Sequence, residues 1–510
     1  MAWQTRTALL ALVAIARPVH AQCADGSPPP CRSAPRPPAA NTIAVLYFDN
    51  LSRDTADAYL ADGFTEELIS RLTQVEQLQV KSRTAVAALR GHPASDPATI
   101  GRSLGVAQLL NGSVLRSGRR LRVNVELTRA STGNSVWGRS FDRASNDLLG
   151  VQAEIAESIA VHVAGRLTTA QRRRVTEQPG RNPRAYDLLL KGRFSLNQHT
   201  TEGILAGIRA LEAAYQMDST LTTALILLSG AYNSLATLYY APNIGFSRDS
   251  ARALSDAYLT RAVERDSLAP GVAMLRAARV DPVLGVRWLE SAVARDPRNA
   301  GLHFSYAVSL RVLGRDSAAL AEFRKSLDLE ADRPITLLNL GQAHLVARRY
   351  KDAVFWLDSA VTFRPDAPYT YSEQGFAHLL LGDTAGARAA ADLAARHGGV
   401  EASDALLAML DARAGDTTAA LSRLAVVERA LARSDCFLSH QCLELSLALA
   451  NVGARERALA LFERLQPRAT WLLYWSGHPY FDPIRADPRF ARIVDESRAN
   501  MEDLRRSISR

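Results

Sequence analysis

From about Asp266 to Pro467 the chain repeats one pattern of small and apolar positions. Apolar residues there are spaced three or four apart, which is the spacing of amphipathic helices. A small residue recurs about every 34 residues, and Gly285 extends the register one unit upstream. The recurring positions are Ala319, Ala353, Ala387, Ala420 and Ala458. Small residues are needed where two helices cross closely, so each unit is predicted to hold a pair of packed helices.

The clearest unit runs from residue 334 to 366. Leu337 and Gly341 lie on one face of a first predicted helix, Ala353 and Leu357 lie on one face of a second, and Pro365 ends it. This period, with two helices per unit, resembles the tetratricopeptide repeat (TPR) and implies an all-α superhelix, or α-solenoid. The residues expected to pack between its helices are Gly285, Ala319, Gly341, Ala353, Gly375, Ala387, Ala420 and Ala458.

The resemblance also implies a concave surface formed by the first helix of each unit. By the register of the family, the groove positions are Phe304, Val308, Arg311, Leu338, Gln342, Leu345, Tyr369, Ser372 and Phe376. These residues are mostly apolar or aromatic, so we expect an apolar segment or helix of a protein partner to bind there. The alternative is that they pack between neighbouring helices or under the C-terminal tail.

Upstream, residues 41–167 alternate between strand-like and helix-like patterns and predict a compact α/β domain with a mixed sheet. Residues 43–48 form a β-rich apolar run, and residues 121–129 alternate apolar and polar positions. The segment 117–119, Ser-Gly-Arg, predicts a hairpin before that strand. Residues 55–73 are helical in pattern, with an expected restart after Gly63.

The same region resembles the TolB N-terminal-like domain, which is related to the FlgO and CsgG-like families. The resemblance rests on residues 43–52 (IAVLYFDNLS), 59–68 (YLADGFTEEL) and 136–142 (VWGRSFD). It implies an association with envelope proteins and their assemblies. Relatives carry this domain and TPR repeats behind cyclase or DNA-binding domains, which implies a regulatory role as an alternative.

The N-terminal sequence predicts export, and the C-terminal sequence predicts a segment that caps the last repeat. Residues 1–21 have the charged start, short apolar run and small-residue cleavage site of a signal peptide, and residues 22–40 form a proline-rich linker. We therefore expect a periplasmic protein without an integral membrane span. This expectation is compatible with association with the outer membrane. Residues 168–184 are expected to be a linker, residues 185–467 the TPR repeats, and residues 468–510 an aromatic capping segment.

Composition changes this picture little. The formal charge is +9, but the basic residues are nearly all arginines interspersed with Asp and Glu along the helices, so nucleic acid is not an expected partner. Four cysteines suit an exported chain. A Cys436–Cys442 disulfide would tighten a helix–helix junction, and Cys23 and Cys31 flank the proline-rich tract. Ligand spacing for a metal site is lacking, so no metal and no cofactor are expected.

Catalysis is not expected either. Asp49, Asp62, Glu66 and Glu67 could form an acid–base group near the first strand, but Glu66 and Glu67 would fall in the first turn of a helix that restarts after Gly63. The prediction is a non-enzymatic scaffold or adaptor of the bacterial cell envelope that binds proteins through its groove and α/β module. The alternatives are a regulatory or signalling sensor module and an enzyme with an unrecognised site in the α/β domain.

Overall fold

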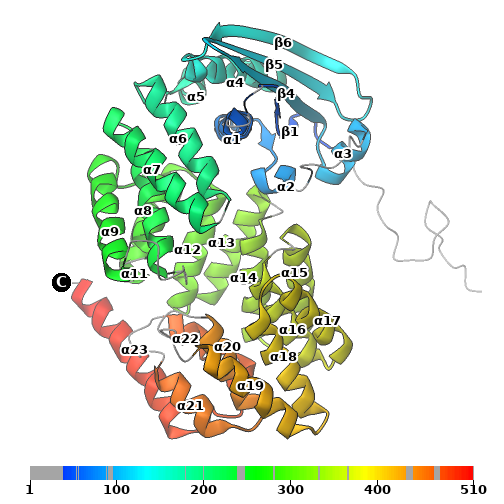
Figure 1. Ribbon diagram of the computed structural model, residues 1–510, viewed down its shortest axis with the longest axis vertical. Coiled ribbons are helices and arrows are strands. Elements are labelled where there is room, and N and C mark those ends of the chain that lie inside the picture. Colours follow the sequence, from blue (N-terminus) through cyan, green and yellow to red (C-terminus); the bar gives the residue numbers. More distant parts are fainter. Residues whose placement is uncertain are drawn as a thin grey trace, which may run out of the picture.

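An α/β module lies at one end of a curved array of helices, and a C-terminal helix runs back along the array (Figure 1). The computed structural model describes residues 38–52, 54, 57–87, 89, 96–178, 180–198, 200–237, 247–278, 282–330, 333–364, 367–431, 440–464 and 471–508. The expected signal peptide, Cys23, Cys31 and Cys436 lie outside these residues. Within the described residues, no helix combines the length and the apolar character needed to cross a membrane.

The α/β module contains one mixed sheet with strand order β3-β1-β4-β5-β6 and a short β2 paired with β4. The strands pair in parallel from β3 to β4 and antiparallel from β4 to β6. Residue Gly118, with φ +58°, forms the β4–β5 turn in the predicted hairpin. The elements are β1 (Thr42–Val45), β2 (Asp49–Asn50), α1 (Ala58–Thr73), β3 (Gln79–Val80), α2 (Arg83–Ala87), α3 (Pro97–Leu104), β4 (Gln108–Ser117), β5 (Arg120–Arg129), β6 (Ser135–Ala144) and α4 (Leu148–Ala164).

The expected helix restart at Gly63 is wrong, because α1 continues through it. A Cβ at Gly63 would lie 3.0 Å from Leu190 Cδ1, so this glycine lets a helix of the first repeat approach α1 closely. Glu66 and Glu67 consequently lie within the helix rather than in a first turn. Glu66 forms ion pairs with Arg83 and Arg193.

The segment expected to be a linker, residues 168–184, holds the helix α5 (Thr169–Thr176), capped by the Thr168 side chain. Val175 is fully buried, and its carbonyl accepts a hydrogen bond of 2.6 Å from the buried side chain of Arg71 in α1. The helix α6 (Pro183–Leu196) follows, and its Tyr186 hydroxyl donates to Gln152 of α4. This part of the chain therefore packs against the α/β module.

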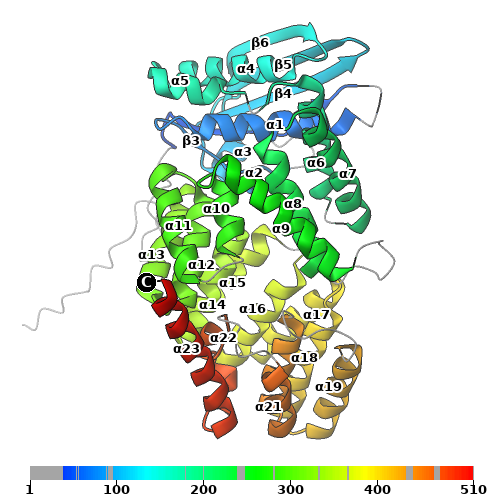
Figure 2. The ribbon, with the colours of Figure 1, turned by 90° about the vertical axis from the view of Figure 1, so that its left-hand side faces the viewer.

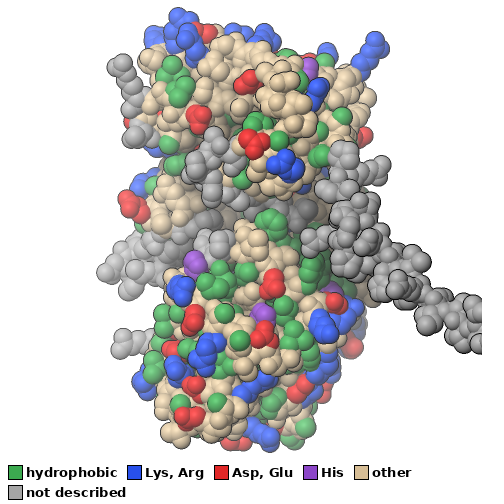
Figure 3. Space-filling model, turned by 90° about the vertical axis from the view of Figure 1, so that its right-hand side faces the viewer, with side chains coloured by type: hydrophobic (Ala, Val, Ile, Leu, Met, Phe, Trp, Pro, Cys, Tyr) green, Lys and Arg blue, Asp and Glu red, His purple; other side chains and the backbone are tan. Residues whose placement is uncertain are grey.

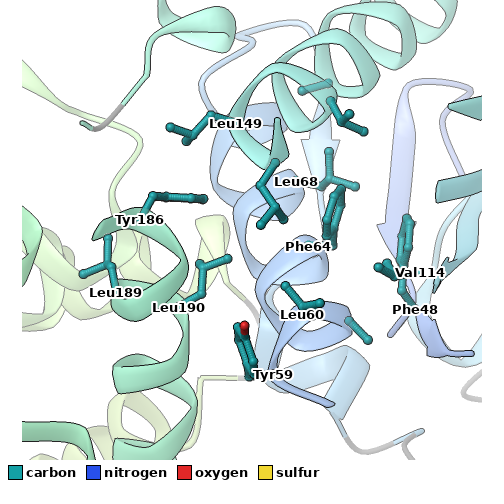
Figure 4. Close-up of a cluster of buried hydrophobic side chains, with 14 of the residues drawn as sticks. Phe48, Tyr59, Leu60, Phe64, Leu68, Val114, Leu149, Tyr186, Leu189 and Leu190 are labelled. Atoms are coloured by element: carbon teal, nitrogen blue, oxygen red, sulfur yellow. The ribbon is translucent and has the colours of Figure 1, made fainter. Parts of the chain in front are cut away.

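The α/β module and the first repeats share one hydrophobic core. Figure 4 shows Tyr186 and Leu190 on the side of α6 that lies toward α1. Farther along the chain, Arg298 donates hydrogen bonds to the carbonyls of Val75 and Leu78, at 2.9 and 2.6 Å. The module is thus held by the array at two separate places.

The helices from α6 onward form a TPR-like solenoid of antiparallel pairs (Figures 1 and 2). The first helices of the later pairs are buried on most sides, whereas the second helices bury one stripe, as α14 and α15 illustrate. After α6 the elements are α7 (Thr201–Met217), α8 (Thr222–Thr237), α9 (Arg248–Arg265), α10 (Pro270–Ala277), α11 (Pro282–Arg295), α12 (Ala300–Val312), α13 (Asp316–Leu329), α14 (Pro334–Val346), α15 (Tyr350–Phe363), α16 (Pro368–Leu381), α17 (Thr384–Arg396), α18 (Val400–Arg413), α19 (Thr417–Leu431), α20 (His440–Asn451) and α21 (Arg455–Arg464).

The small residues singled out by the repeat lie at close contacts. The alanines of the second helices, at positions 319, 353, 387, 420 and 458, are all fully buried. A Cβ at Gly341 would lie 2.5 Å from Leu357, one at Gly375 would lie 2.5 Å from Leu406, and one at Gly285 would meet the Ala277 carbonyl at 3.2 Å. These contacts set how closely neighbouring helices pack.

The C-terminal segment consists of α22 (Trp471–Trp475), the 3-10 turn η3 (Pro479–Phe481) and α23 (Pro488–Ile508). Its turn η3 contacts α20, its helix α22 contacts α12, and α23 extends from α21 back to α11 (Figures 1 and 2). The segment expected to cap the last repeat therefore also spans earlier repeats.

We predict that Gly341→Ala destabilises the array, because the new methyl group overlaps Leu357. Overpacking of this kind costs about 1–3 kcal/mol, which thermal unfolding followed by circular dichroism would detect as a lower midpoint. Gly230→Ala in α8 is the matched control, since a Cβ there meets no atom within 4 Å. The control should leave the midpoint unchanged or raise it, and equal destabilisation of both variants would contradict the close contact.

Candidate functional site

The inner side of the later repeats holds part of the C-terminal segment. Tyr480 of η3 is buried, and its hydroxyl donates a hydrogen bond of 2.9 Å to the carbonyl of Phe376 in α16. Its own carbonyl accepts one of 2.7 Å from the side chain of Asn451 at the end of α20. The chain thus binds one of its own turns through main-chain and aromatic contacts.

The neighbouring side chains extend this aromatic contact. The fully buried ring of His478 stacks on Tyr480, with centroids 5.6 Å apart, and meets Phe376 edge-on at 6.3 Å. Burial lowers the pKa of His478 to about 3, so the ring is neutral at neutral pH. Its Nδ1 accepts from the Tyr480 amide, and Nε2 has no hydrogen-bond partner in this aromatic setting.

Phe481, the residue after Tyr480, faces the last repeat instead. Its ring centroid lies 4.9 Å from that of Phe462 in α21, and Phe490 of α23 stacks on Phe462 at 4.7 Å. These three fully or nearly fully buried rings close the apolar end of the array. Tyr480 and Phe481 are adjacent in one turn, but Tyr480 packs on the inner side of the solenoid and Phe481 packs on its end.

Arg348 joins the array to the same turn by a bidentate ion pair with Asp482. Its Nη1 and Nη2 lie 2.7 and 2.9 Å from the two carboxylate oxygens. Arg348 has φ +59°, the single positive value among described non-glycine residues. The matching turns of other repeats hold Gly314, Gly382, Gly415 and Gly453, whose φ angles lie between +70° and +89°.

This exception has a conformational cost and a limited direct gain. A left-handed conformation costs a residue with a side chain about 1–2 kcal/mol, which glycine avoids. The Arg348–Asp482 pair is about half exposed, with 50% and 42% of the two side chains accessible. Exposed pairs contribute about 1 kcal/mol or less. Asp482 also pairs with Arg485, and the two-point geometry strengthens the Arg348 pair, so its gain is of the same order as the cost of the backbone conformation.

A cleft of about 750 Å³ lies beside the C-terminal segment. The ends of α12 and α14 contribute Leu313 and Val346, and α23 contributes Ala491, Val494 and Met501. Arg311 and Arg485 add charge to its wall. The cleft means that the C-terminal segment leaves open space against these repeats, whereas it packs densely against α21.

A buried polar cluster lies on the inner helices. The Gln342 side chain donates to the Tyr369 hydroxyl at 2.6 Å, and that hydroxyl donates to Glu373 at 3.0 Å. Arg311 donates to the carbonyl and side-chain oxygens of Asn339, at 2.9 and 3.1 Å. The sequence had pointed to Gln342, Tyr369 and Arg311, and the structure brings the first two into direct contact.

Two carboxyl groups in and near this polar cluster, those of Glu373 and Glu444, are almost completely buried. Burial raises the pKa of Glu373 to about 7, against hydrogen bonds from Tyr369 and Gln342 that lower it. Burial and the nearby Glu373 raise the pKa of Glu444 in α20 to about 8. One oxygen of each carboxyl group lacks a hydrogen-bond partner, which suits a protonated, neutral acid.

The predicted groove residues lie mostly in packed surroundings. Leu345 and Phe376 are fully buried, while Arg311, Leu338 and Gln342 expose 5–6% of their surface. Phe304 and Val308 are partly buried beside Phe323. At Phe376 the structure shows the alternative interpretation, packing under the C-terminal segment, because Tyr480 and His478 cover this ring. Sequence reasoning missed Glu373, although it follows Tyr369 by one helical turn, and it missed the role of Arg348.

Other candidate chemistry is sparse among the described residues. They contain no group of three or more His, Cys, Asp or Glu residues suited to a metal ion. A second cavity of about 410 Å³, between the α/β module and the end of α13, is lined by Glu76, Lys81 and Arg298 among others. Cys442 is buried and disulfide-bonded. Its pairing with Cys436 stays a prediction, because Cys436 lies outside the described residues.

Charges on the face shown in Figure 3 are mixed over the helical array, with basic and acidic side chains interspersed. Ion pairs such as Arg423–Asp411 and Arg457–Glu428 also join basic and acidic side chains of the array. On the face shown, basic residues thus lie among Asp and Glu as they do along the sequence.

Comparison with known proteins gives partial matches. No protein-family model matches the chain. Over 222 residues the chain is 33% identical to the protein named "Putative adenylate cyclase 3" from Rhizobium meliloti (strain 1021), a match that covers 42% of this chain and 38% of that protein. The matched part thus spans little more than a third of that relative's length.

Two solved structures were found to be similar to parts of the chain, both with low scores. For pilF of Pseudomonas aeruginosa the identity is 21%, the coverage is 41% of this chain and 93% of that chain, and the TM-score is 0.32. For yeast Tom70 the identity is 14%, the coverage is 87% and 85%, and the TM-score is 0.36. Scores this low carry no conclusion about partners or activity.

The buried carboxyl groups generate a prediction for pH dependence. Because the folded-state pKa values of Glu373 and Glu444 lie above the usual value of 4.5, their contribution to stability is complete below about pH 4.5. It is lost as the pH rises toward 7 and 8, where the folded protein must also release these protons. Between pH 5 and 8 the free energy of unfolding should fall by on the order of 6 kcal/mol, about 3 kcal/mol for each of the two groups.

The Glu373→Gln, Glu444→Gln double variant should lack this fall, since glutamine mimics the neutral acid at every pH. Urea unfolding of both proteins at pH 5, 6.5 and 8 measures the difference. Glu264→Gln, at an exposed position of α9, is the control and should follow the wild type. A difference between wild type and double variant that stays constant over this range would contradict the buried, neutral acids.

Proposed function

We propose that this protein is an interaction scaffold of the cell envelope whose helical array binds a polypeptide segment of another protein. The observation that carries the proposal is the turn around Tyr480, which the inner side of the repeats holds by hydrogen bonds to main-chain groups and by an ion pair. Main-chain contacts of this kind suit a polypeptide ligand. The adjoining cleft of about 750 Å³ offers room for one.

The envelope location rests on sequence. Residues 1–21 have the pattern of a signal peptide, and residues 41–167 resemble the TolB N-terminal-like domain. By analogy, the α/β module would meet an envelope component in the periplasm while the array holds a second protein. That the protein is not an enzyme stays a prediction.

A regulatory module is the second candidate, and the identity to the protein named "Putative adenylate cyclase 3" favours it. In this alternative the array and the α/β module would serve as an input unit for a signalling output. The two candidates differ in where the protein resides, because the first requires export and the second is expected in the cytoplasm.

Partner capture tests the scaffold. Ala491→Trp places a large ring in the cleft from the exposed side of α23, and Ala499→Trp adds the same ring to α23 at a position that does not line the cleft. After cross-linking in envelope fractions, we expect one protein captured by wild type and Ala499→Trp but reduced about tenfold or more with Ala491→Trp, equivalent to about 1.4 kcal/mol or more. Equal capture by both variants would remove the cleft from the proposal.

Export tests the location. A reporter that is active only outside the cytoplasm, fused after residue 40, should be active when residues 1–21 are intact. Replacing the apolar residues Leu9, Leu10 and Leu12 by Asp should abolish that activity, because the apolar run of the signal would be lost. The same fusion can be made to a second reporter that is active only in the cytoplasm. Activity of that second reporter alone, with residues 1–21 intact, would favour the regulatory module instead.

A further inference from the structure

We propose that the surface formed by Arg348, Phe376 and Asn451 recognises a turn with a tyrosine followed two residues later by a carboxylate, and that the chain's own Tyr480–Asp482 turn occupies it until a partner segment of this chemistry displaces it. This inference rests on the proposed function and specifies the partner. Its basis is the occupant already in place, which shows what each part of the surface binds.

Three contacts define the recognised chemistry. The carbonyl of Phe376 accepts from a tyrosine hydroxyl, the side-chain amide of Asn451 donates to the main chain of the turn, and Arg348 holds a carboxylate with both of its terminal nitrogens. The planar guanidinium matches a carboxylate in two-point geometry, which a lysine cannot reproduce. A partner segment with an aromatic hydroxyl and an acidic side chain at this spacing would satisfy all three.

Arg348 is the residue that makes this site differ from its counterparts. The equivalent turns of other repeats that have a positive φ carry glycine, whereas residue 348 has a side chain in the same left-handed conformation. Backbone strain that persists in one repeat points to a function for the strained residue. Its carboxylate contact with Asp482 is half exposed and accessible to a competing acid.

Displacement of the turn also withdraws Phe481 from Phe462 of α21, because Phe481 lies between Tyr480 and Asp482 and the rings of Tyr480, Phe481 and Phe462 share one apolar cluster. Phe490 of α23 lies outside the turn and can stay stacked on Phe462, which keeps part of the cap in place. On the other side, the cleft next to Val346 leaves the segment loosely packed against α12 and α14. A segment joined to the array in cis competes at an effective concentration on the order of millimolar. An outside segment therefore binds poorly until the cis contacts weaken.

The test uses a fluorescent peptide of residues 475–490 added to the full chain. Wild type should bind it weakly, and the Tyr480→Ala, Asp482→Ala chain should bind it about tenfold more tightly or better by fluorescence anisotropy, because its own turn no longer competes. Adding Arg348→Gly to that chain should reverse the gain, while Arg349→Ala, which removes the same charge one residue away, should not. Peptide binding that is no tighter to the opened chain, or that is insensitive to Arg348→Gly, would overturn the proposal.

Folding is controlled by circular dichroism and by a milder variant. Asp482→Asn conserves the size of the side chain and should accelerate hydrogen exchange of residues 475–490 without altering exchange in the distant helix α6. Unchanged exchange in residues 475–490 would also count against the proposal. The peptide experiment needs no partner protein, so its failure leaves partner capture untouched. Conversely, peptide binding without any captured protein would count against the scaffold and retain the recognition surface.

Discussion

The close approach of the two helices in each repeat is the constraint on which the rest of the structure depends. Gly341 admits Leu357 into the space that a side chain would fill, and Ala353 is completely buried in the same pair. Repetition of such contacts keeps the first helices inside and the second helices outside. The inner side, the cleft and the buried polar cluster all follow from this arrangement.

A stacked array also creates two ends that must be covered. At one end, α6 places Tyr186, Leu189 and Leu190 into the core of the α/β module, so the module and the repeats share apolar burial (Figure 4). At the other end, Phe481 and Phe490 cover Phe462. The C-terminal segment reaches that end by passing the inner side, and this path brings Tyr480 and Asp482 to α16 and Arg348.

The sequence indicates local features better than contacts between distant segments. The repeat register identified the paired helices and the buried alanines, and the alternation in residues 121–129 identified β5. By contrast, the prediction of a helix break at Gly63 was wrong. This glycine gives space to Leu190, which lies far along the chain, and the local sequence does not show that contact. The neutral state of Glu444 depends on burial and on Glu373 in another helix, neither of which a linear pattern reveals.

The same limit explains why Arg348 could not be singled out beforehand, although its signal was present. The repeat register aligns it with glycines, but without a structure an arginine in a turn reads as an ordinary exposed residue. The positive φ shows that this backbone has the conformation of the glycine turns, so the side chain is retained against a preference of the backbone. That side chain contacts Asp482 in the C-terminal segment. A residue that departs from its repeat and contacts the occupant of the inner surface is placed to hold that occupant, and this contact offsets the cost of its backbone conformation.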